Sequence, residues 1–185
     1  LKVSDKIVSV SAYGIITETE FNYVSTNGSE INQNFLMVTT DFSANAQDGN
    51  ILQRRTGGRS GNQIGMEVFE EDRVLSLCNT IGEQAIELLT AEECPSGKFD
   101  LVLTPDQMML QIHESIGHAL EIDRILGDER NYAGWSFVKL EDFGKLQYGS
   151  KHMNITFDPT LESEFASYAF DDGGLKATKE YLIKD

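Results

Sequence analysis

Basic residues are scarce in this chain of 185 amino acids, and the deficit limits the partners that it can bind. Fifteen lysines and arginines stand against thirty aspartates and glutamates, which gives a formal net charge of −15 at pH 7. A surface of this charge repels phosphate backbones and anionic lipids. We therefore expect no direct nucleic-acid binding and no membrane binding.

Long apolar runs and cysteines are also few. No stretch is long and apolar enough to span a bilayer, and the N-terminus lacks the basic-then-apolar order of a signal peptide. The two cysteines, Cys78 and Cys94, are too few for a disulfide framework, so a reducing compartment is the simpler assumption. We expect a cytoplasmic protein. The first residue is Leu1 and not methionine, which suggests a removed start or a piece of a longer chain.

The first third of the chain predicts antiparallel strands joined by tight turns. Apolar and polar residues alternate there with the period of two that marks a strand with one buried face. Asn27-Gly28 tolerates positive φ and favours a hairpin, and residues 47–50 predict a second turn. The expected strands cover residues 7–16, 20–25, 35–42 and 51–55. They form an antiparallel meander.

A glycine-rich segment and an amphipathic helix are expected next. Residues 56–62 hold three glycines, and because no phosphate-binding pattern follows them, we interpret this segment as a mobile loop. From Val74 to Leu89 the apolar residues recur at the spacing of a helix with one buried face. Acidic residues 70–72 near its start suit the positive end of the helix dipole.

A second helix has a strong start signal. Residues 99–103 predict a short buried strand. Thr104 then offers an N-cap, Pro105 suits the first helical position, and Gln107 could close a capping box. We expect the helix to continue until Gly127 offers a stop.

The remaining residues predict short elements. Residues 127–150 show no clear period and suggest a long ordered loop, while 153–157 alternate as a strand does. Residues 168–170 and 181–183 predict two more short strands, which flank the acidic turn at 171–174. The expected fold class is α+β, with antiparallel strands, a packed amphipathic helix and a long motif-bearing helix.

The second helix carries two of the three histidines of the chain. His113 and His118 are five positions apart, and Glu114 follows the first of them. Neutral imidazole is a good zinc ligand, and a carboxylate beside a metal-bound water can act as its general base. Five steps of about 100° each separate two side chains on a regular α-helix by about 140°, which is too far for joint ligation. A single π turn would bring them together, and Gly117 would ease that distortion.

Two histidines leave the proposed site incomplete, because a catalytic zinc ion usually has three protein ligands. Spacing alone also leaves open that both are ordinary helix residues. The candidates for a third ligand within the chain are Glu121, Asp123, His152, Cys78 and Cys94. Each has a simpler structural interpretation, and none stands out.

Three segments give the chain a family resemblance. The His-Glu-x-x-x-His order at 113–118 resembles the motif of the TldD/PmbA metallopeptidases, the modulator of DNA gyrase family. Residues 154–160 resemble the strand of that family that ends in an Asp-x-Pro-type turn. Residues 168–174 resemble its Tyr-x-x-Asp-Asp-Glu-Gly segment, although Gly173 stands where the family usually has glutamate. The order and rough spacing of all three agree with the family.

The resemblance implies roles for the motif residues. His113 and His118 would be zinc ligands, and Glu114 would be the base that activates water. The third ligand would be a cysteine in a C-terminal region, beyond Asp185. The chain would then be a central piece of a TldD-like protein. Residues 1–98 would end an N-terminal strand-and-helix domain, and residues 99–185 would hold the motif helix and begin the C-terminal catalytic domain.

The resemblance also implies a function and partners. The full-length protein would be a cytoplasmic zinc metallopeptidase that hydrolyses unfolded or short peptides inside a chamber of two subunits. It would form a homodimer or a heterodimer with a PmbA-like subunit. The isolated piece is expected to be inactive, with less than one tightly bound zinc ion per chain. The alternative is a non-catalytic assembly or interaction module of a peptidase complex.

Overall fold

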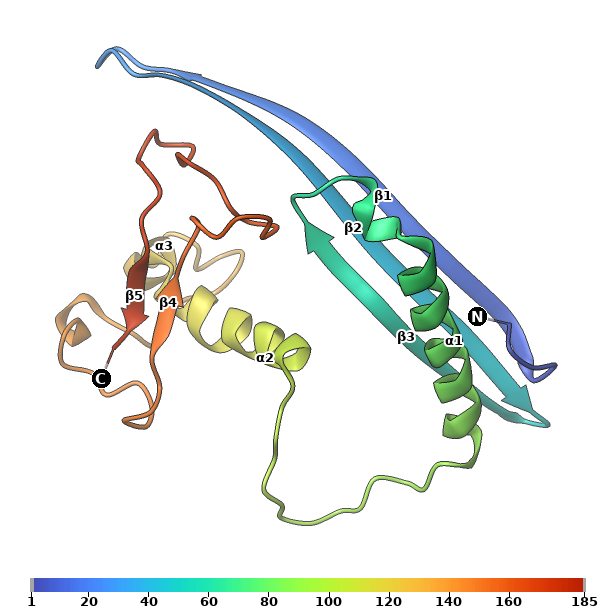
Figure 1. Ribbon diagram of the computed structural model, residues 1–185. Coiled ribbons are helices and arrows are strands. Elements are labelled where there is room, and N and C mark those ends of the chain that lie inside the picture. The colour runs from blue at the N-terminus through green and yellow to red at the C-terminus, as the bar shows by residue number, and fades with distance from the viewer. Residues whose placement is uncertain (1, 185) are drawn as a thin grey trace. The chain divides into compact units, whose positions relative to one another are not determined.

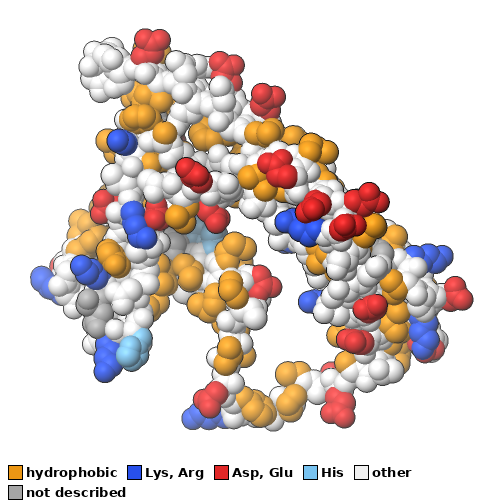
Figure 2. All heavy atoms as spheres, in the orientation of Figure 1, with side chains coloured by type: hydrophobic (Ala, Val, Ile, Leu, Met, Phe, Trp, Pro, Cys, Tyr) orange, Lys and Arg blue, Asp and Glu red, His pale blue; other side chains and the backbone are white. Residues whose placement is uncertain are grey.

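The computed structural model describes residues 2–184, which fold into two compact units (Figure 1). The first unit holds the residues up to Cys94 together with Asp158–Lys179. The second holds Pro95–Phe157 and the residues from Glu180 onward. Antiparallel sheets and separate helices confirm the α+β class. Acidic side chains are scattered over the face that Figure 2 shows, in keeping with the net charge of −15.

A three-stranded antiparallel sheet forms the frame of the first unit. Its order is β1 (Ile7–Val24), β2 (Glu30–Asp48) and β3 (Ile51–Asn62). The expected turn at Asn27-Gly28 is confirmed: Gly28 has φ 92°, and the Ser29 amide donates to Asn27 Oδ1 at 2.9 Å. The meander is confirmed as well, with longer strands than predicted, because the two strands expected before this turn are one continuous strand.

The mobile loop predicted for residues 56–62 is wrong, because β3 runs through it. Its glycines allow a helix to come close to the sheet. A Cβ atom at Gly57 would lie 3.0 Å from Ile81, and one at Gly58 would lie 2.5 Å from Leu77. Gly58 also has φ 65° at a register shift between β3 and β2, which is where a bulge uses glycine. Glycine at these two positions therefore allows the helix to pack closely against β3.

Helix α1 (Glu71–Glu87) packs on this sheet and confirms the predicted amphipathic helix (Figure 1). The 3₁₀ turns η1 (Met66–Phe69) and η2 (Leu88–Thr90) flank it. Glu71 and Asp72 lie in its first turn, as expected from the helix dipole. The main core cluster lies between helix and sheet and comprises Ile7, Phe42, Ala44, Ala46, Cys78, Ile81, Ala85 and Leu89.

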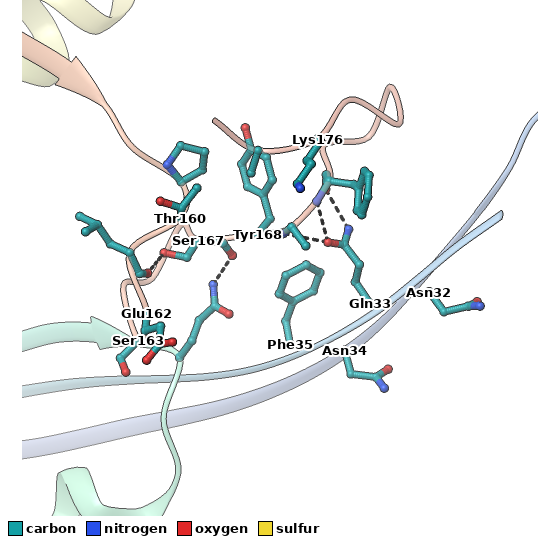
Figure 3. A pocket seen from close by; sticks show the side chains of 16 residues that line it. Asn32, Gln33, Asn34, Phe35, Thr160, Glu162, Ser163, Ser167, Tyr168 and Lys176 are labelled. Carbon is teal, nitrogen blue, oxygen red and sulfur yellow. Dashed lines mark hydrogen bonds between the residues drawn. The ribbon is translucent and has the colours of Figure 1, made fainter. Parts of the chain in front are cut away.

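Residues 158–179 of the first unit are attached to β2 by a glutamine. The Gln33 Oε1 atom accepts hydrogen bonds from the amides of Ala169 and Phe170 at 3.0 and 2.9 Å, and its Nε2 donates to the Phe170 carbonyl at 2.8 Å (Figure 3). Beside these bonds lies an open cavity of about 610 Å³, with Phe35 and Tyr168 in its wall (Figure 3). The side-chain amide of Gln33 therefore pairs with the backbone of residues 169 and 170, as a neighbouring strand would. These bonds attach the segment 158–179 to β2.

The second unit contains a broken helix and a small sheet. Its elements are α2 (Pro105–Ile112), the π turn η3 (His113–Gly117), the 3₁₀ turns η4 (His118–Leu120) and η5 (Leu140–Asp142), α3 (Ile122–Leu126), β4 (Ile155–Phe157) and β5 (Glu180–Ile183). Thr104 is the N-cap residue, Pro105 begins the helix, and Gly127 ends it with φ 91°, as predicted. The prediction of one continuous helix is wrong, because Glu121 has an extended backbone with ψ of 124° that interrupts it. The capping box is wrong too, because the Thr104 hydroxyl donates to the carboxylate of Asp106.

Two of the short strands expected in the second half differ from prediction. Residues 99–103 form no strand, and the side chains of Leu101 and Val102 are 78% and 92% exposed, because no strand among residues 2–184 pairs with them. Residues 168–170 contribute only the isolated bridge between Phe170 and Lys176. Strands β4 and β5 confirm the other two. None of the helices between residues 2 and 184 has the length and apolar character needed to cross a membrane.

Candidate metal centre

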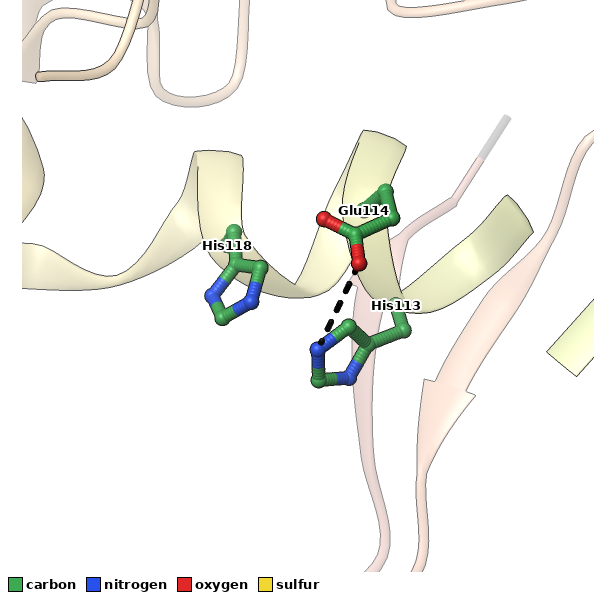
Figure 4. Close-up of side chains that lie close together, drawn as sticks. All are labelled: His113, Glu114 and His118. Carbon is green, nitrogen blue, oxygen red and sulfur yellow. Dashed lines mark ion pairs between the residues drawn. The ribbon is translucent and has the colours of Figure 1, made fainter. Parts of the chain in front are cut away.

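The π turn η3 places the two histidines of the motif on one side of the helix (Figure 4). The amide of His118 donates to the carbonyl of His113, five residues earlier, so the predicted local widening is confirmed. The two imidazole rings are 4.3 Å apart between centroids and meet edge to face at 77°. The wider π turn thus accommodates the additional residue between the two histidines.

Glu114 completes a cluster of possible metal-binding atoms. One atom each from His113, Glu114 and His118 can be chosen so that all lie within 4.8 Å of one another. The Glu114 Oε1 atom is 3.9 Å from His113 Nε2 (Figure 4). The side chains of His113 and Glu114 are 58% and 62% exposed, so solvent and a ligand can reach them. Imidazole nitrogens and a carboxylate oxygen at this spacing fit a divalent metal ion.

Glu121, a candidate third ligand, is bound to other side chains. Its Oε1 atom lies 2.7 Å from His118 Nδ1, and its Oε2 atom lies 2.6 Å from Arg124 Nε. The hydrogen bond from His118 lowers the pKa of Glu121 below its ordinary value, and the charge of Arg124 acts in the same direction. The group is therefore a carboxylate that faces the imidazole.

Asp123 and His152, the other candidate ligands of the second unit, are not part of the His113–Glu114–His118 cluster. The Asp123 carboxylate accepts a hydrogen bond from the Arg124 amide at 2.9 Å. Cys78 is buried in the core of the first unit and Cys94 is exposed in the same unit. His152 lies in a turn, where its amide donates to a serine hydroxyl. Within residues 2–184, the cluster thus has two histidines and one glutamate.

Side chains from the loop after α3 hold the irregular helix in shape. The Tyr148 hydroxyl donates to the Ser115 carbonyl in η3, and the Ser136 hydroxyl donates to the Ala119 carbonyl in η4, each at 2.5 Å. Such donors satisfy carbonyls where regular helical pairing is lost. Burial raises the pKa of Tyr148. Sequence reasoning missed these residues, because nothing in the aperiodic segment 127–150 marks them.

Gly117 contributes less to the π turn than its position suggested. Its φ and ψ of −52° and −63° are helical. A Cβ atom there would have the Ile112 carbonyl oxygen as its nearest neighbour, at 3.9 Å, which is an ordinary van der Waals distance. Glycine is therefore not sterically required, and the loop contacts account better for the wide turn.

Comparisons with known proteins extend these observations. Residues 96–185 match the family model of the PmbA/TldA metallopeptidase C-terminal domain. A metalloprotease of Methanothermobacter thermautotrophicus is 32% identical over 98% of this chain and 38% of its own length. A metalloprotease of Methanocaldococcus jannaschii is 30% identical over 97% of this chain and 37% of its own length.

A third relative carries a more specific name. A metalloprotease TldD homolog of Haemophilus influenzae is 31% identical over 70% of this chain and 26% of its own length. No solved structure matches the chain. The chain spans at most about 38% of the length of these relatives.

Proposed function

Because the chain belongs to the PmbA/TldD metallopeptidase family, we propose that His113, Glu114 and His118 form part of a zinc-dependent peptidase site. The observation that carries the proposal is the π turn, which brings two imidazoles to 4.3 Å beside a carboxylate. A regular helix with the same residues would separate these groups. The distorted backbone therefore supports a metal site, because it brings both imidazoles close enough to bind one ion.

The motif residues divide the chemistry between them. His113 and His118 would hold a zinc ion, which supplies Lewis-acid polarisation of a peptide carbonyl when it is bound. Glu114 accepts a proton from the attacking water as the water oxygen bonds to the carbonyl carbon. The same carboxyl then gives that proton to the leaving amine as the C–N bond breaks. The exposure of Glu114 leaves room for substrate beside it.

The third zinc ligand is proposed to come from outside residues 1–185, as a cysteine of a C-terminal region. Catalytic zinc sites usually combine three protein ligands with an open position, and the cluster offers two histidines with Glu114 reserved as base. We expect the 185-residue chain alone to be inactive and to keep less than one zinc ion after dialysis against a chelator. Stoichiometric zinc after dialysis would instead indicate a third ligand within the chain.

The wider assignments concern the full-length protein. We propose that it acts in the cytoplasm on unfolded or short peptides. It would assemble as a homodimer or with a PmbA-like subunit, without nucleic acid or membrane. In this assignment residues 1–98 end an N-terminal domain, and residues 99–185 begin the catalytic one. The family membership and the fragmentary coverage of the relatives support these assignments.

A Glu114→Gln substitution in the full-length protein tests the catalytic role. We expect hydrolysis of an unfolded peptide, with the partner subunit present, to fall by about 10²- to 10⁴-fold, because a general base contributes about that factor. Zinc content should stay unchanged. Glu141→Gln, an exposed carboxylate of η5, is the matched control. Undiminished hydrolysis by Glu114→Gln would defeat the catalytic assignment and favour the non-catalytic assembly module.

A further inference from the structure

Two charged side chains next to His118 take no part in the proposed steps. They belong to Glu121 and Arg124, which follow His118 at intervals of three residues across the break between η4 and α3. The imidazole Nδ1 atom is 2.7 Å from one oxygen of Glu121, and Arg124 Nε is 2.6 Å from the other. Both carboxylate oxygens therefore already have a partner.

Arg124 is itself fixed by the loop that follows α3. Its Nη1 atom donates to the Ala133 carbonyl at 3.2 Å, and its own carbonyl accepts from the Ser136 amide at 3.2 Å. The Arg124 side chain is 19% exposed, so water competes little for these bonds. Ser136 in turn donates to the carbonyl of Ala119, the residue after His118. The ion pair thus joins the histidine to an anchored loop.

The contact with Glu121 decides which nitrogen of His118 carries the proton. An ionised carboxylate can only accept a hydrogen bond, so at 2.7 Å the imidazole must donate from Nδ1. In a neutral imidazole the other nitrogen, Nε2, then keeps its lone pair. That nitrogen is free to bind a metal ion.

We propose that Glu121, held by Arg124, is a positioning residue that fixes the ring and tautomer of His118 so that Nε2 faces the metal ion. The proposal rests on the zinc site described above and deepens it. Carboxylates that orient a ligand histidine typically change metal affinity by about 10- to 100-fold when they are removed. Glu121, which by spacing alone was a candidate third ligand, would act through His118 instead.

The first test needs no metal ion. In the metal-free 185-residue chain, ¹⁵N chemical shifts of the imidazoles report the tautomer. We expect His118 to carry its proton on Nδ1 and Glu121→Ala to give the tautomer mixture of a free imidazole. Glu141→Ala, which removes an exposed carboxylate elsewhere in the unit, should leave His118 unchanged. An Nε2-protonated His118 in the unsubstituted chain would overturn the proposal without any variant.

The second test measures zinc affinity in the full-length protein by competition with a chelator. Glu121→Ala should lower the affinity by about 10- to 100-fold. Arg124→Lys should lower it less, because lysine keeps the charge and loses the planar fork that reaches both Glu121 and Ala133. His118→Ala should abolish tight binding.

The outcomes separate this proposal from the function on which it rests. If Glu121→Ala leaves both tautomer and affinity unchanged while His118→Ala abolishes binding, the positioning role is wrong and the zinc site stands. If His118→Ala binds zinc as the unsubstituted protein does, the zinc site itself is wrong. If Glu121→Ala abolishes binding as fully as His118→Ala, Glu121 is a ligand and the positioning role is also wrong.

Discussion

The two principal helical segments of this chain are built in opposite ways. Helix α1 is regular over 17 residues and buries Cys78, Ile81 and Ala85 against a sheet. The segment 105–126 changes from α to π to 3₁₀ winding, and Ile116 is its one buried residue. Hydroxyl groups and an arginine shape that second segment, where the candidate metal centre lies.

The difference shows how stability and chemistry are distributed. Apolar burial favours regular winding, because a repeated stripe fits a flat sheet. A metal site needs particular atoms at particular places, and here the backbone departs from regularity to provide them. Truncation of a buried side chain in the first segment should therefore lower the free energy of unfolding, whereas loss of a side chain that shapes the second segment should lower zinc affinity.

Ile81→Ala should have the largest effect on stability. Ile81 is 2% exposed in the core cluster, and truncation of such a side chain costs about 2–5 kcal/mol of the free energy of unfolding. Urea denaturation measures the loss. Leu75→Ala on the same helix is the control, because Leu75 is 53% exposed and should cost less than about 0.5 kcal/mol. Equal losses would mean that α1 is not held by its buried face.

Tyr148→Phe should have an intermediate effect, located at the metal centre. It removes the donor to the exposed Ser115 carbonyl, and a typical hydrogen bond contributes about 0.5–1.5 kcal/mol to stability. Hydrogen exchange of the η3 amides should accelerate, and zinc affinity should fall. Tyr132→Phe is the control, because Tyr132 is 95% exposed. If η3 exchanges at the same rate in both variants, the π turn is set within the helix and not by the loop.

Gly117→Ala should have a small and favourable effect. Alanine is a better helix former than glycine by up to about 1 kcal/mol, and a Cβ atom there meets nothing closer than 3.9 Å. Nuclear Overhauser contacts between the rings of His113 and His118 should persist. Their loss would show that the glycine is needed for the π turn after all.

The smallest effect is expected from pH, in the first unit. The hydrogen bond from the Thr160 hydroxyl, helped by Lys179 at 3.3 Å, lowers the pKa of Asp158 below its ordinary value. Because this pKa is lower in the folded state, the interaction stabilises the fold at pH values above the ordinary pKa of aspartate. That stability is lost as the pH falls through the pKa of the folded state. Lys179 is 59% exposed, so the gain is small. Asp158→Asn should flatten this part of a stability-against-pH curve, and an unchanged curve would contradict the assignment.

Local patterns in the sequence predicted the regular parts of the fold. Apolar spacing gave α1, Asn27-Gly28 gave the hairpin turn, and the capping residues Thr104 and Pro105 gave the start of α2. Each of these signals acts between residues close in the chain. The prediction of a loop for residues 56–62 is wrong because two of the glycines make room for Leu77 and Ile81. These side chains come from a helix later in the chain.

The candidate site could be predicted only in part. The five-residue spacing of His113 and His118 required a wide turn, and the structure has one. The contacts of Tyr148 and Ser136 could not be foreseen, because they join the helix to a loop without a sequence period. Residues 99–103 were expected to be buried, which needs a partner strand that a sequence pattern cannot supply. The roles of the motif residues stay predictions.

X-ray absorption of the zinc-loaded full-length protein can show whether His113 and His118 bind the metal ion. We expect two imidazole nitrogens at about 2.0–2.1 Å from the zinc ion. Both should disappear from the spectrum, together with tight binding, when His113 and His118 are replaced by alanine. An unchanged spectrum and affinity in that double variant would contradict the claim that the π turn builds a metal site.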